Sequence, residues 1–170
     1  MRLPLTPPPA KRVFDLLGAL ALLGALALPL LAICAALYAA HRGRVFVREP
    51  AAGLGGRPFR TWRFRTAPDG LLRRHALDRL PQLINVVRGE MSLVGPRPQP
   101  PGAAGGICSA DRLFVRPGIT GLWQVGDRTG MPWEEMELLD RHYVEHHWLG
   151  MDLRILARTP RAAVGPRRVP

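Results

Sequence analysis

One aspartate, Asp78, stands among arginines in the middle of the chain, and this grouping could do chemistry. Arg73, Arg74 and Arg79 lie within five residues of it. A carboxylate among guanidinium groups can act as a nucleophile in a site built for phosphates, because arginine binds phosphate oxygens in pairs. The same residues are also typical of an aspartate at the start of a helix, beside solvated arginines. Taken alone, the stretch favours the helix-start interpretation and leaves the nucleophile as the alternative.

A short amphipathic helix followed by a stiff loop must position these residues. The apolar side chains that recur at helical spacing are Leu80, Leu83, Ile84 and Val87. Pro81 lies early, where a helix tolerates proline, and Gly89 is suited to end the helix. The loop that follows contains Gly95-Pro96-Arg97-Pro98. Its prolines fix the backbone and hold the guanidinium of Arg97 in place.

The composition indicates one compact domain with an appendage, because the chain has 170 residues. Its formal charge is +11, and Lys11 is the only lysine. Such a charge suits nucleic acid, an anionic membrane face or phosphorylated substrates. The sequence contains no recognised nucleic-acid motif, which leaves the membrane and the phosphates. Cys34 and Cys108 are not expected to pair, so nothing argues for an oxidising compartment.

An uncharged apolar run, residues 16–40, is long enough to enter a membrane. Pro29 lies in its middle and removes a helical hydrogen bond to Ala25. Basic residues lie on both sides of the run, so the positive-inside tendency keeps both ends on the cytoplasmic side. A helix broken at Pro29 that enters and returns satisfies both features. A kinked helix that crosses the membrane remains the alternative.

Short elements follow the apolar run. Residues 44–48 and 59–65 are predicted to form a β-hairpin around the glycine-rich turn 53–56. The hairpin is strongly basic: it is either solvated or reaches lipid headgroups or a phosphate. Residues 131–147 and 149–163 are predicted to be helices, the second interrupted by Pro160.

Two further features are weaker candidates for binding. The segment 112–128 combines several glycines with Arg116 and Arg128, which could clamp a phosphate, although it matches no standard nucleotide motif. His142 and His146 are four residues apart and could share a face, as zinc ligands do. No glutamate completes that zinc pattern, so surface histidines are the better interpretation.

Taken together, these motifs resemble the bacterial sugar transferase family, the monotopic phosphoglycosyl transferases. The similarity runs from the K-R-x-F-D entry at residue 11 to about residue 159. It includes Phe64-Arg65-Thr66, Leu72-Arg73-Arg74, Leu80-Pro81-Gln82-Leu83, Met91-Ser92-Leu93-Val94-Gly95-Pro96-Arg97-Pro98, Arg116-Pro117-Gly118-Ile119-Thr120-Gly121, Trp123-Gln124-Val125, Asp140, Tyr143-Val144 and Asp152-Leu153.

The resemblance implies an α+β fold, and the chain is expected in three parts. Residues 1–10 are rich in proline and are expected to form a disordered leader. Residues 11–40 form a re-entrant membrane helix, helix–break–helix at Pro29. Residues 41–170 form a small, mainly helical catalytic domain with a short β-hairpin. The protein is then expected at the bacterial inner membrane with its domain facing the cytoplasm.

The resemblance also implies a reaction. An aspartate attacks the sugar-proximal phosphate of a nucleoside diphosphate sugar, usually a UDP-sugar, and forms a covalent phosphosugar. Polyprenyl phosphate then accepts the sugar phosphate, which starts exopolysaccharide or glycan assembly. Neither nucleic acid nor a particular oligomeric state is implied, and a homo-oligomer remains open.

Site residues carry over by motif. The nucleophile maps to Asp78, and the Mg²⁺ ligands map to Asp78 and Asp140. The expected phosphate-binding arginines are Arg65, Arg73, Arg97, Arg116 and Arg128.

The family pattern breaks at the residue after the nucleophile. Members have an Asp-Glu pair there, whereas this chain has Asp78 followed by Arg79. Arg79 could supply part of the positive charge that a metal provides and keep Asp78 ionised. More simply, it removes an oxygen ligand and repels Mg²⁺. The alternative function is therefore a catalytically impaired relative that acts as a membrane-bound binding or regulatory protein.

Overall fold

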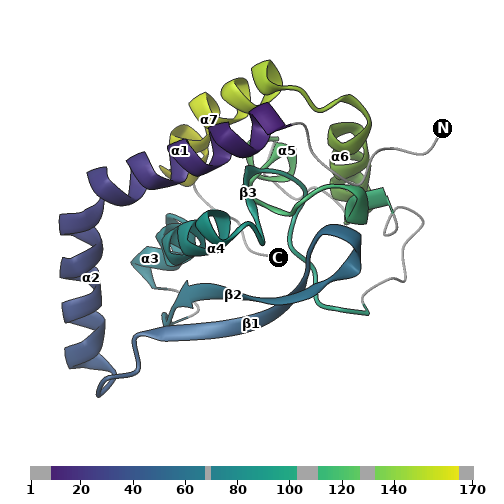
Figure 1. Cartoon of the computed structure of the whole chain (residues 1–170). Coiled ribbons are helices and arrows are strands. Elements are labelled where there is room, and N and C mark those ends of the chain that lie inside the picture. The colour runs from purple at the N-terminus through teal and green to yellow at the C-terminus, as the bar shows by residue number, and fades with distance from the viewer. Residues whose placement is uncertain (1–8, 68–69, 103–110, 127–132, 165–170) are drawn as a thin grey trace.

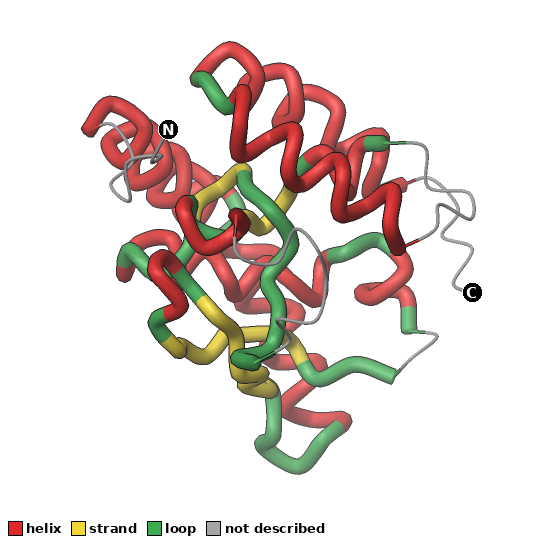
Figure 2. The backbone as a smooth tube through the Cα atoms, turned by 90° about the vertical axis from the view of Figure 1, so that its right-hand side faces the viewer, coloured by secondary structure: helices red, strands yellow, loops and turns green. Residues whose placement is uncertain are grey.

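The computed structural model describes residues 9–67, 70–102, 111–126 and 133–164, and these form an α+β body with two small sheets. Helices make up more of the fold than strands, as the perpendicular view shows (Figure 2). The elements in chain order are α1 (Pro9–Ala25), α2 (Ala27–Ala40), β1 (Phe46–Ala52), the 3-10 helix η1 (Leu54–Gly56), β2 (Pro58–Phe64), α3 (Leu71–Arg74), the 3-10 helix η2 (Leu77–Gln82), α4 (Leu83–Arg88), β3 (Ser92–Val94), the 3-10 helix η3 (Asp111–Phe114), β4 (Gly118–Thr120), α5 (Leu122–Val125), α6 (Trp133–His146) and α7 (Leu149–Val164).

The apolar run forms two helices, as predicted, but the break is not at Pro29. Helices α1 and α2 meet at Leu26 with a bend of 65° (Figure 1). Pro29 lies in the first turn of α2, where a missing N–H is tolerated. A proline ring crowds the carbonyl four residues earlier, which here is that of Ala25, the last residue of α1. The break therefore falls upstream of the proline that explains it.

No single helix in the described part of the chain is long and apolar enough to span a membrane. The bent pair α1–α2 passes that test together, by length and composition. Helix α2 buries none of its residues, and Leu28 at its start is 81% exposed. A helix that is apolar all round and uncovered by protein is typical of a lipid environment.

The first half of α1 is attached to the domain by buried charges. The Nζ atom of Lys11 lies 2.7 Å from Oδ2 of Asp152 in α7. Asp15, one turn along α1, accepts hydrogen bonds from the hydroxyl of Ser92 and the amide of Leu93 in β3. These contacts hold α1 against the hydrophobic core, whose buried members are Ala19, Leu83, Val86, Met91, Leu93, Val94, Tyr143 and Ile155.

The predicted β-hairpin is present, although its first strand lies further along the chain. Strands β1 and β2 pair antiparallel from Phe46 opposite Phe64 to Ala52 opposite Pro58. Pro50 therefore lies inside a strand that the sequence ended at residue 48. A two-stranded sheet tolerates a proline inside a strand, because one edge of each strand pairs with no other strand and requires no N–H donor there.

The second sheet was not predicted. Strands β3 and β4 pair in parallel, with Ser92 opposite Gly118 and Val94 opposite Thr120. A Cβ atom at Gly118 would collide with the backbone of Gly95, so only glycine allows this approach. The pairing fixes the start of the Gly95–Pro98 loop.

The predicted helix after residue 77 consists of two pieces, the 3-10 turn η2 and then α4. Gly89 ends α4 with φ of +83°, which confirms the predicted cap. The helix α6 is also confirmed. The predicted interruption at Pro160 is wrong, because α7 continues past this exposed residue to Val164.

Candidate active site

Asp78 lies in the first turn of η2 and is only 2% exposed. Ala76 directly before η2 has a left-handed backbone, φ +57°, which separates η2 from α3. The Oδ2 atom of Asp78 accepts a hydrogen bond of 2.7 Å from Nη2 of Arg63 in β2. Its Oδ1 atom is buried and has no hydrogen-bond partner within the described part of the chain. A carboxylate with one satisfied and one unpaired buried oxygen is oriented and available for a ligand.

Arg63 connects this carboxylate to the hairpin. Its Nη1 atom donates to Oε2 of Glu49 in β1 at 2.9 Å. Burial disfavours the charge of Arg63, but Asp78 and Glu49 outweigh burial and raise the pKa of its guanidinium. Arg63 therefore remains a cation held between two carboxylates.

A second buried carboxylate, Asp140 in α6, is 1% exposed. Its Oδ2 atom lies 3.1 Å from Nη2 of Arg112 and accepts a hydrogen bond of 3.3 Å from the amide of Arg97. Its Oδ1 atom, like that of Asp78, has no hydrogen-bond partner among the described residues. Burial raises the pKa of Asp140 to about 6, although Arg112 and Arg97 act to lower it.

The loop after β3 brings Arg97 between these groups. Hydrogen bonds from Gly95 to the carbonyl of Thr120 and from Gly118 to the carbonyl of Pro96, both 2.9 Å, join the loop to β4. Burial lowers the pKa of the Arg97 guanidinium, Asp140 opposes that effect, and Arg63 and Arg112 add to it. The arginines are therefore close enough to repel one another, and an anion placed among them would be strongly stabilised.

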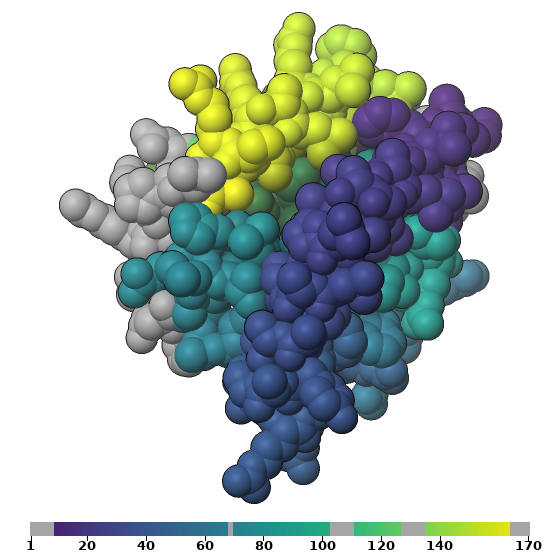
Figure 3. Space-filling view, turned by 90° about the vertical axis from the view of Figure 1, so that its left-hand side faces the viewer, coloured from purple at the N-terminus to yellow at the C-terminus, as the bar shows by residue number. Residues whose placement is uncertain are grey.

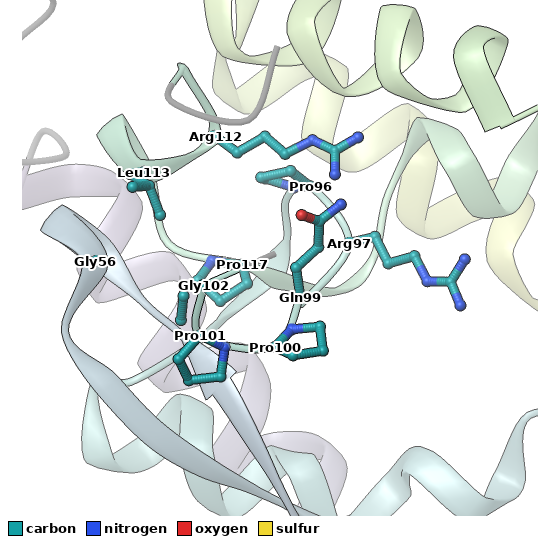
Figure 4. Close-up of a pocket in the computed structure, with 11 residues that line it drawn as sticks. Gly56, Pro96, Arg97, Gln99, Pro100, Pro101, Gly102, Arg112, Leu113 and Pro117 are labelled. Atoms are coloured by element: carbon teal, nitrogen blue, oxygen red, sulfur yellow. The ribbon is translucent and has the colours of Figure 1, made fainter. Parts of the chain in front are cut away.

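A cavity of about 370 Å³ opens beside these arginines, and we call it the polar cavity. Its charged lining residues are Glu49, Arg63, Arg79 and Arg97. Asp78 is not part of the lining, but Arg63, which binds it, is. A neighbouring cavity of about 130 Å³ shares Arg97, Gln99 and Pro100 with it. In Figure 4 the guanidinium groups of Arg97 and Arg112 point to the same side of the Pro96–Gly102 loop.

The predicted site residues divide into two groups. Arg79 and Arg97 line the polar cavity, Asp78 is bound to the lining residue Arg63, and Asp140 accepts a hydrogen bond from the backbone amide of Arg97.

The other predicted arginines line neither of these two cavities. Arg116 donates from Nε to the carbonyl of Gly89, which supports the end of α4. Arg65 follows β2 and hydrogen-bonds through its amide to the carbonyl of Val45, while Arg73 is exposed on α3. Arg128 lies outside the described residues.

Sequence reasoning did not single out Arg63 and Arg112. The basic character of the hairpin was a signal for Arg63, since it indicated that the hairpin could reach a phosphate. Nothing in the sequence marked Arg112, which lies in a short turn and contacts Asp140 only through the fold.

Within the described residues, no group of three or more His, Cys, Asp or Glu side chains could hold a metal ion. Mg²⁺ in phosphate-transfer sites is commonly bound by one or two carboxylates and completed by substrate phosphates and water. The unpaired Oδ1 atom of Asp140 fits that arrangement. His142 and His146 stack on each other with ring centroids 4.6 Å apart on the exposed side of α6, away from this set.

Comparison with known proteins decides the family. The profile of the family described as "Bacterial sugar transferase" matches residues 7–166. The chain belongs to the bacterial sugar transferase family.

Three relatives within this family illustrate its range. The chain is 35% identical over 172 residues to the "Uncharacterized sugar transferase EpsL" of Bacillus subtilis, which covers 89% of this chain and 85% of the relative. It is 38% identical over 183 residues to the "UDP-glucose:undecaprenyl-phosphate glucose-1-phosphate transferase" of Caulobacter vibrioides, covering 88% and 67%. It is 30% identical over 188 residues to the "Exopolysaccharide production protein ExoY" of Sinorhizobium fredii, covering 88% and 83%.

Proposed function

We propose that this family member transfers a sugar 1-phosphate from a UDP-sugar to polyprenyl phosphate through an intermediate on Asp78, and so starts exopolysaccharide or glycan assembly. The observation that carries the proposal is the buried carboxylate of Asp78, with one unpaired oxygen, bound to an arginine of the polar cavity. The names of the relatives support the same substrates.

The donor diphosphate occupies the polar cavity in this proposal. Arg63, Arg79 and Arg97 line that cavity and bind the phosphate oxygens. The arriving phosphate competes with Asp78 for the guanidinium of Arg63, which frees the carboxylate. Exchange of one anion for another costs little, because Arg63 keeps a charged partner throughout.

Asp78 then attacks the sugar-proximal phosphorus. A bond forms between a carboxylate oxygen and phosphorus, and the bond from that phosphorus to the bridging oxygen breaks. UMP leaves with the electron pair of that bond. In the second step an oxygen of polyprenyl phosphate attacks the same phosphorus and the Asp78 carboxylate is released. The arginines stabilise the charge that develops on the equatorial and leaving oxygens.

Asp140 is the residue that would hold Mg²⁺, through its unpaired oxygen and together with the diphosphate. The ion would supply further neutralisation of charge on the leaving UMP. Asp140 must be ionised for this role, which its raised pKa makes dependent on pH.

The bent pair α1–α2 is proposed to be re-entrant, with the domain on the cytoplasmic face of the inner membrane. Lys11 ties the start of α1 to α7, and the end of α2 leads within six residues into β1 of the same domain. Both ends of the pair therefore join one folded body. A pair that crossed the membrane would place its two ends on opposite sides.

The experiment measures the first step alone. The full chain in nanodiscs is mixed with a panel of UDP-sugars and Mg²⁺ and without lipid acceptor. UMP release and transfer of label from the sugar-proximal phosphate to protein are followed. Hydroxylamine should release that label, because it cleaves acyl phosphates. Asp78→Asn should abolish both signals, whereas the exposed-carboxylate control Glu145→Gln should leave them unchanged.

Two outcomes would reject the proposal. Equal UMP release by wild type and Asp78→Asn on every donor excludes Asp78 as nucleophile. Activity that occurs only in Arg79→Glu supports the second candidate, a catalytically impaired relative that binds ligands at the membrane. The observation that supports this second candidate is Arg79, which occupies the position of the family glutamate.

A further inference from the structure

An apolar cavity of about 170 Å³ lies between η2 and the bend of the α1–α2 pair. Leu22 and Leu26, at the bend between α1 and α2, form one wall. Leu80 of η2 and Leu156 of α7 contribute to the other walls. Figure 3 shows this face, where the bent pair runs past α7 and past the teal segment that carries α3 and η2. The cavity therefore begins where the proposed membrane helix turns.

Arg79 is the residue that connects this apolar cavity with the polar cavity. Among the described residues it is the only one that lines both. It follows Asp78 directly in η2, so a group bound by Arg79 lies close to the nucleophile. The two cavities thus meet at Arg79: the apolar cavity is lined mainly by apolar groups, and the polar cavity also contains Arg63 and Arg97 in its lining.

The aromatic ring of Trp123 holds Arg79 at this position. The guanidinium carbon of Arg79 lies 4.9 Å from the ring centroid, a cation–π contact. The ring is itself fixed, since its Nε1 atom donates to the carbonyl of Gly95 at 3.2 Å. A Cβ atom at Gly121 would collide with both the ring and that carbonyl, so the ring lies tight against the backbone. The head of Arg79 is therefore pre-positioned.

We propose that the apolar cavity binds the phosphate-proximal end of the isoprenoid acceptor and that Arg79 binds its phosphate at the border of the two cavities. The inference rests on the proposed function, because the acceptor must reach the phosphosugar on Asp78. The cavity is smaller than the roughly 300–1,000 Å³ of pockets that enclose drug-sized ligands, so only the first part of the chain enters it. The rest of the chain remains in lipid beside α1.

The positive charge of Arg79 determines whether binding of the acceptor requires a metal ion. A carboxylate at position 79 would repel the lipid phosphate unless a metal ion lay between them. A guanidinium attracts the phosphate directly and can bind two of its oxygens. Binding of the acceptor should therefore need no divalent cation, unlike the donor step proposed above.

The test measures binding of the acceptor without any sugar donor. The full chain in phosphatidylcholine nanodiscs with EDTA is titrated with a photoreactive isoprenyl phosphate and with the corresponding isoprenyl alcohol. Wild type should prefer the phosphate. Arg79→Gln should lose roughly tenfold to hundredfold of that preference and keep its affinity for the alcohol, because a charge-assisted hydrogen bond is lost. Arg74→Gln, an exposed arginine on α3, is the charge-matched control and should behave as wild type.

A second variant changes the apolar cavity and leaves the charge of Arg79 in place. Ala163 lines the apolar cavity near the end of α7, and Ala163→Phe should fill it and weaken both probes by about tenfold or more. Ala157→Phe adds the same ring to an exposed position of α7 and should weaken neither. Thermal unfolding of all variants shows that each one folds.

Three results would overturn the inference. The first is an unchanged phosphate preference in Arg79→Gln, and the second is dependence of wild-type binding on Mg²⁺. The third is full competition by excess phosphatidate, which would mean that Arg79 binds any lipid phosphate. The failure of the proposed function is a separate observation, namely absence of Asp78-dependent UMP release. Because the binding assay contains no donor, the acceptor-site inference can fail while the proposed function holds, and the proposed function can fail while the inference holds.

Discussion

Substitution of Lys11 by methionine should weaken the attachment of α1 to the domain. Lys11 is 6% exposed, and its partner Asp152 is fully buried. Besides the 2.7 Å ion pair with Asp152, the amine donates to the carbonyl of Val94 at 3.3 Å. Methionine has a similar length and no charge, so the substitution removes the ion pair while it largely preserves packing.

The expected loss in the free energy of unfolding depends on the hydrogen bond that Asp152 retains after the substitution. Removal of one partner of a buried ion pair typically costs about 3–5 kcal/mol, because the other charge remains buried without compensation. The Oδ1 atom of Asp152 still accepts a hydrogen bond of 2.7 Å from the hydroxyl of Tyr143. We therefore expect a loss of about 3 kcal/mol, at the lower end of that range.

A double-mutant cycle separates the ion pair from the packing. The free energy of unfolding is measured in detergent for wild type, Lys11→Met, Asp152→Asn and the double variant. The coupling energy should be about 1–3 kcal/mol, since the double variant buries no unpaired charge. Arg161→Met, at an exposed position of α7, is the control and should change the free energy by less than about 0.5 kcal/mol.

A chemical probe reports the same contact independently. Lys11 is the only lysine of the chain, so amine-reactive labelling of side chains reports on this one group. Wild type should label slowly because the amine is buried, and Asp152→Asn should label faster. Additive free energies in the cycle, together with equal labelling rates in wild type and Asp152→Asn, would refute the assignment of this pair as the attachment of α1.

Four more predictions concern the site and the membrane. Burial raises the pKa of Asp140 to about 6, so Mg²⁺-dependent UMP release should rise as the pH increases through about 6 and then level off. Arg112 lowers that pKa, so Arg112→Gln should move the rise to higher pH in the same assay. Gly121→Ala should lower the melting temperature and weaken binding of isoprenyl phosphate, because the added methyl group displaces Trp123. Leu28→Arg should increase the fraction of protein that carbonate extracts from membranes, because this exposed position of α2 would carry a charge into lipid at a cost of about 2.5–3.5 kcal/mol.

The elements that local patterns determine were predictable from the sequence. Helical spacing of apolar residues predicted α4, the sequence of residues 131–147 predicted α6, and Gly89 marked the end of α4 by its backbone freedom. The uncharged run indicated the bent pair, since length and hydropathy are properties of a segment. The position of its break was missed by three residues, because proline disrupts the helix upstream of itself.

Long-range contacts were not predictable in the same way. The parallel pairing of β3 with β4 joins two three-residue strands separated by more than twenty residues, which are too short to show a periodic pattern. It depends on two glycine backbones that approach each other, and a glycine in the sequence does not reveal its partner. The Gly95–Pro98 loop was therefore recognised as stiff, but its direction toward Asp140 was not.

The choice among many arginines shows where sequence reasoning about the site reaches its limit. The family motifs assigned Asp78 and Asp140 to phosphate chemistry, and both are buried carboxylates with one oxygen that has no hydrogen-bond partner among the described residues. Which arginines surround them depends on register: a shift of β2 by one residue would turn Arg63 to the opposite face of the hairpin. Arg116 lies in a matching motif, yet its guanidinium supports the carbonyl of Gly89.

Arg79 brings these two kinds of information together. In the sequence it marks only the loss of a family carboxylate, which argues against catalysis. In the fold it stacks on Trp123 where an arginine-lined cavity meets an apolar one. A cation at that position is expected to repel a metal ion and to attract a phosphate, so the change from glutamate to Arg79 should weaken a magnesium site and strengthen the proposed site for a lipid phosphate. With Arg79 in place of the family glutamate, the donor step requires that Asp140 hold Mg²⁺ without that second carboxylate while Asp78 acts as the nucleophile. The pH dependence of Mg²⁺-dependent UMP release tests this requirement.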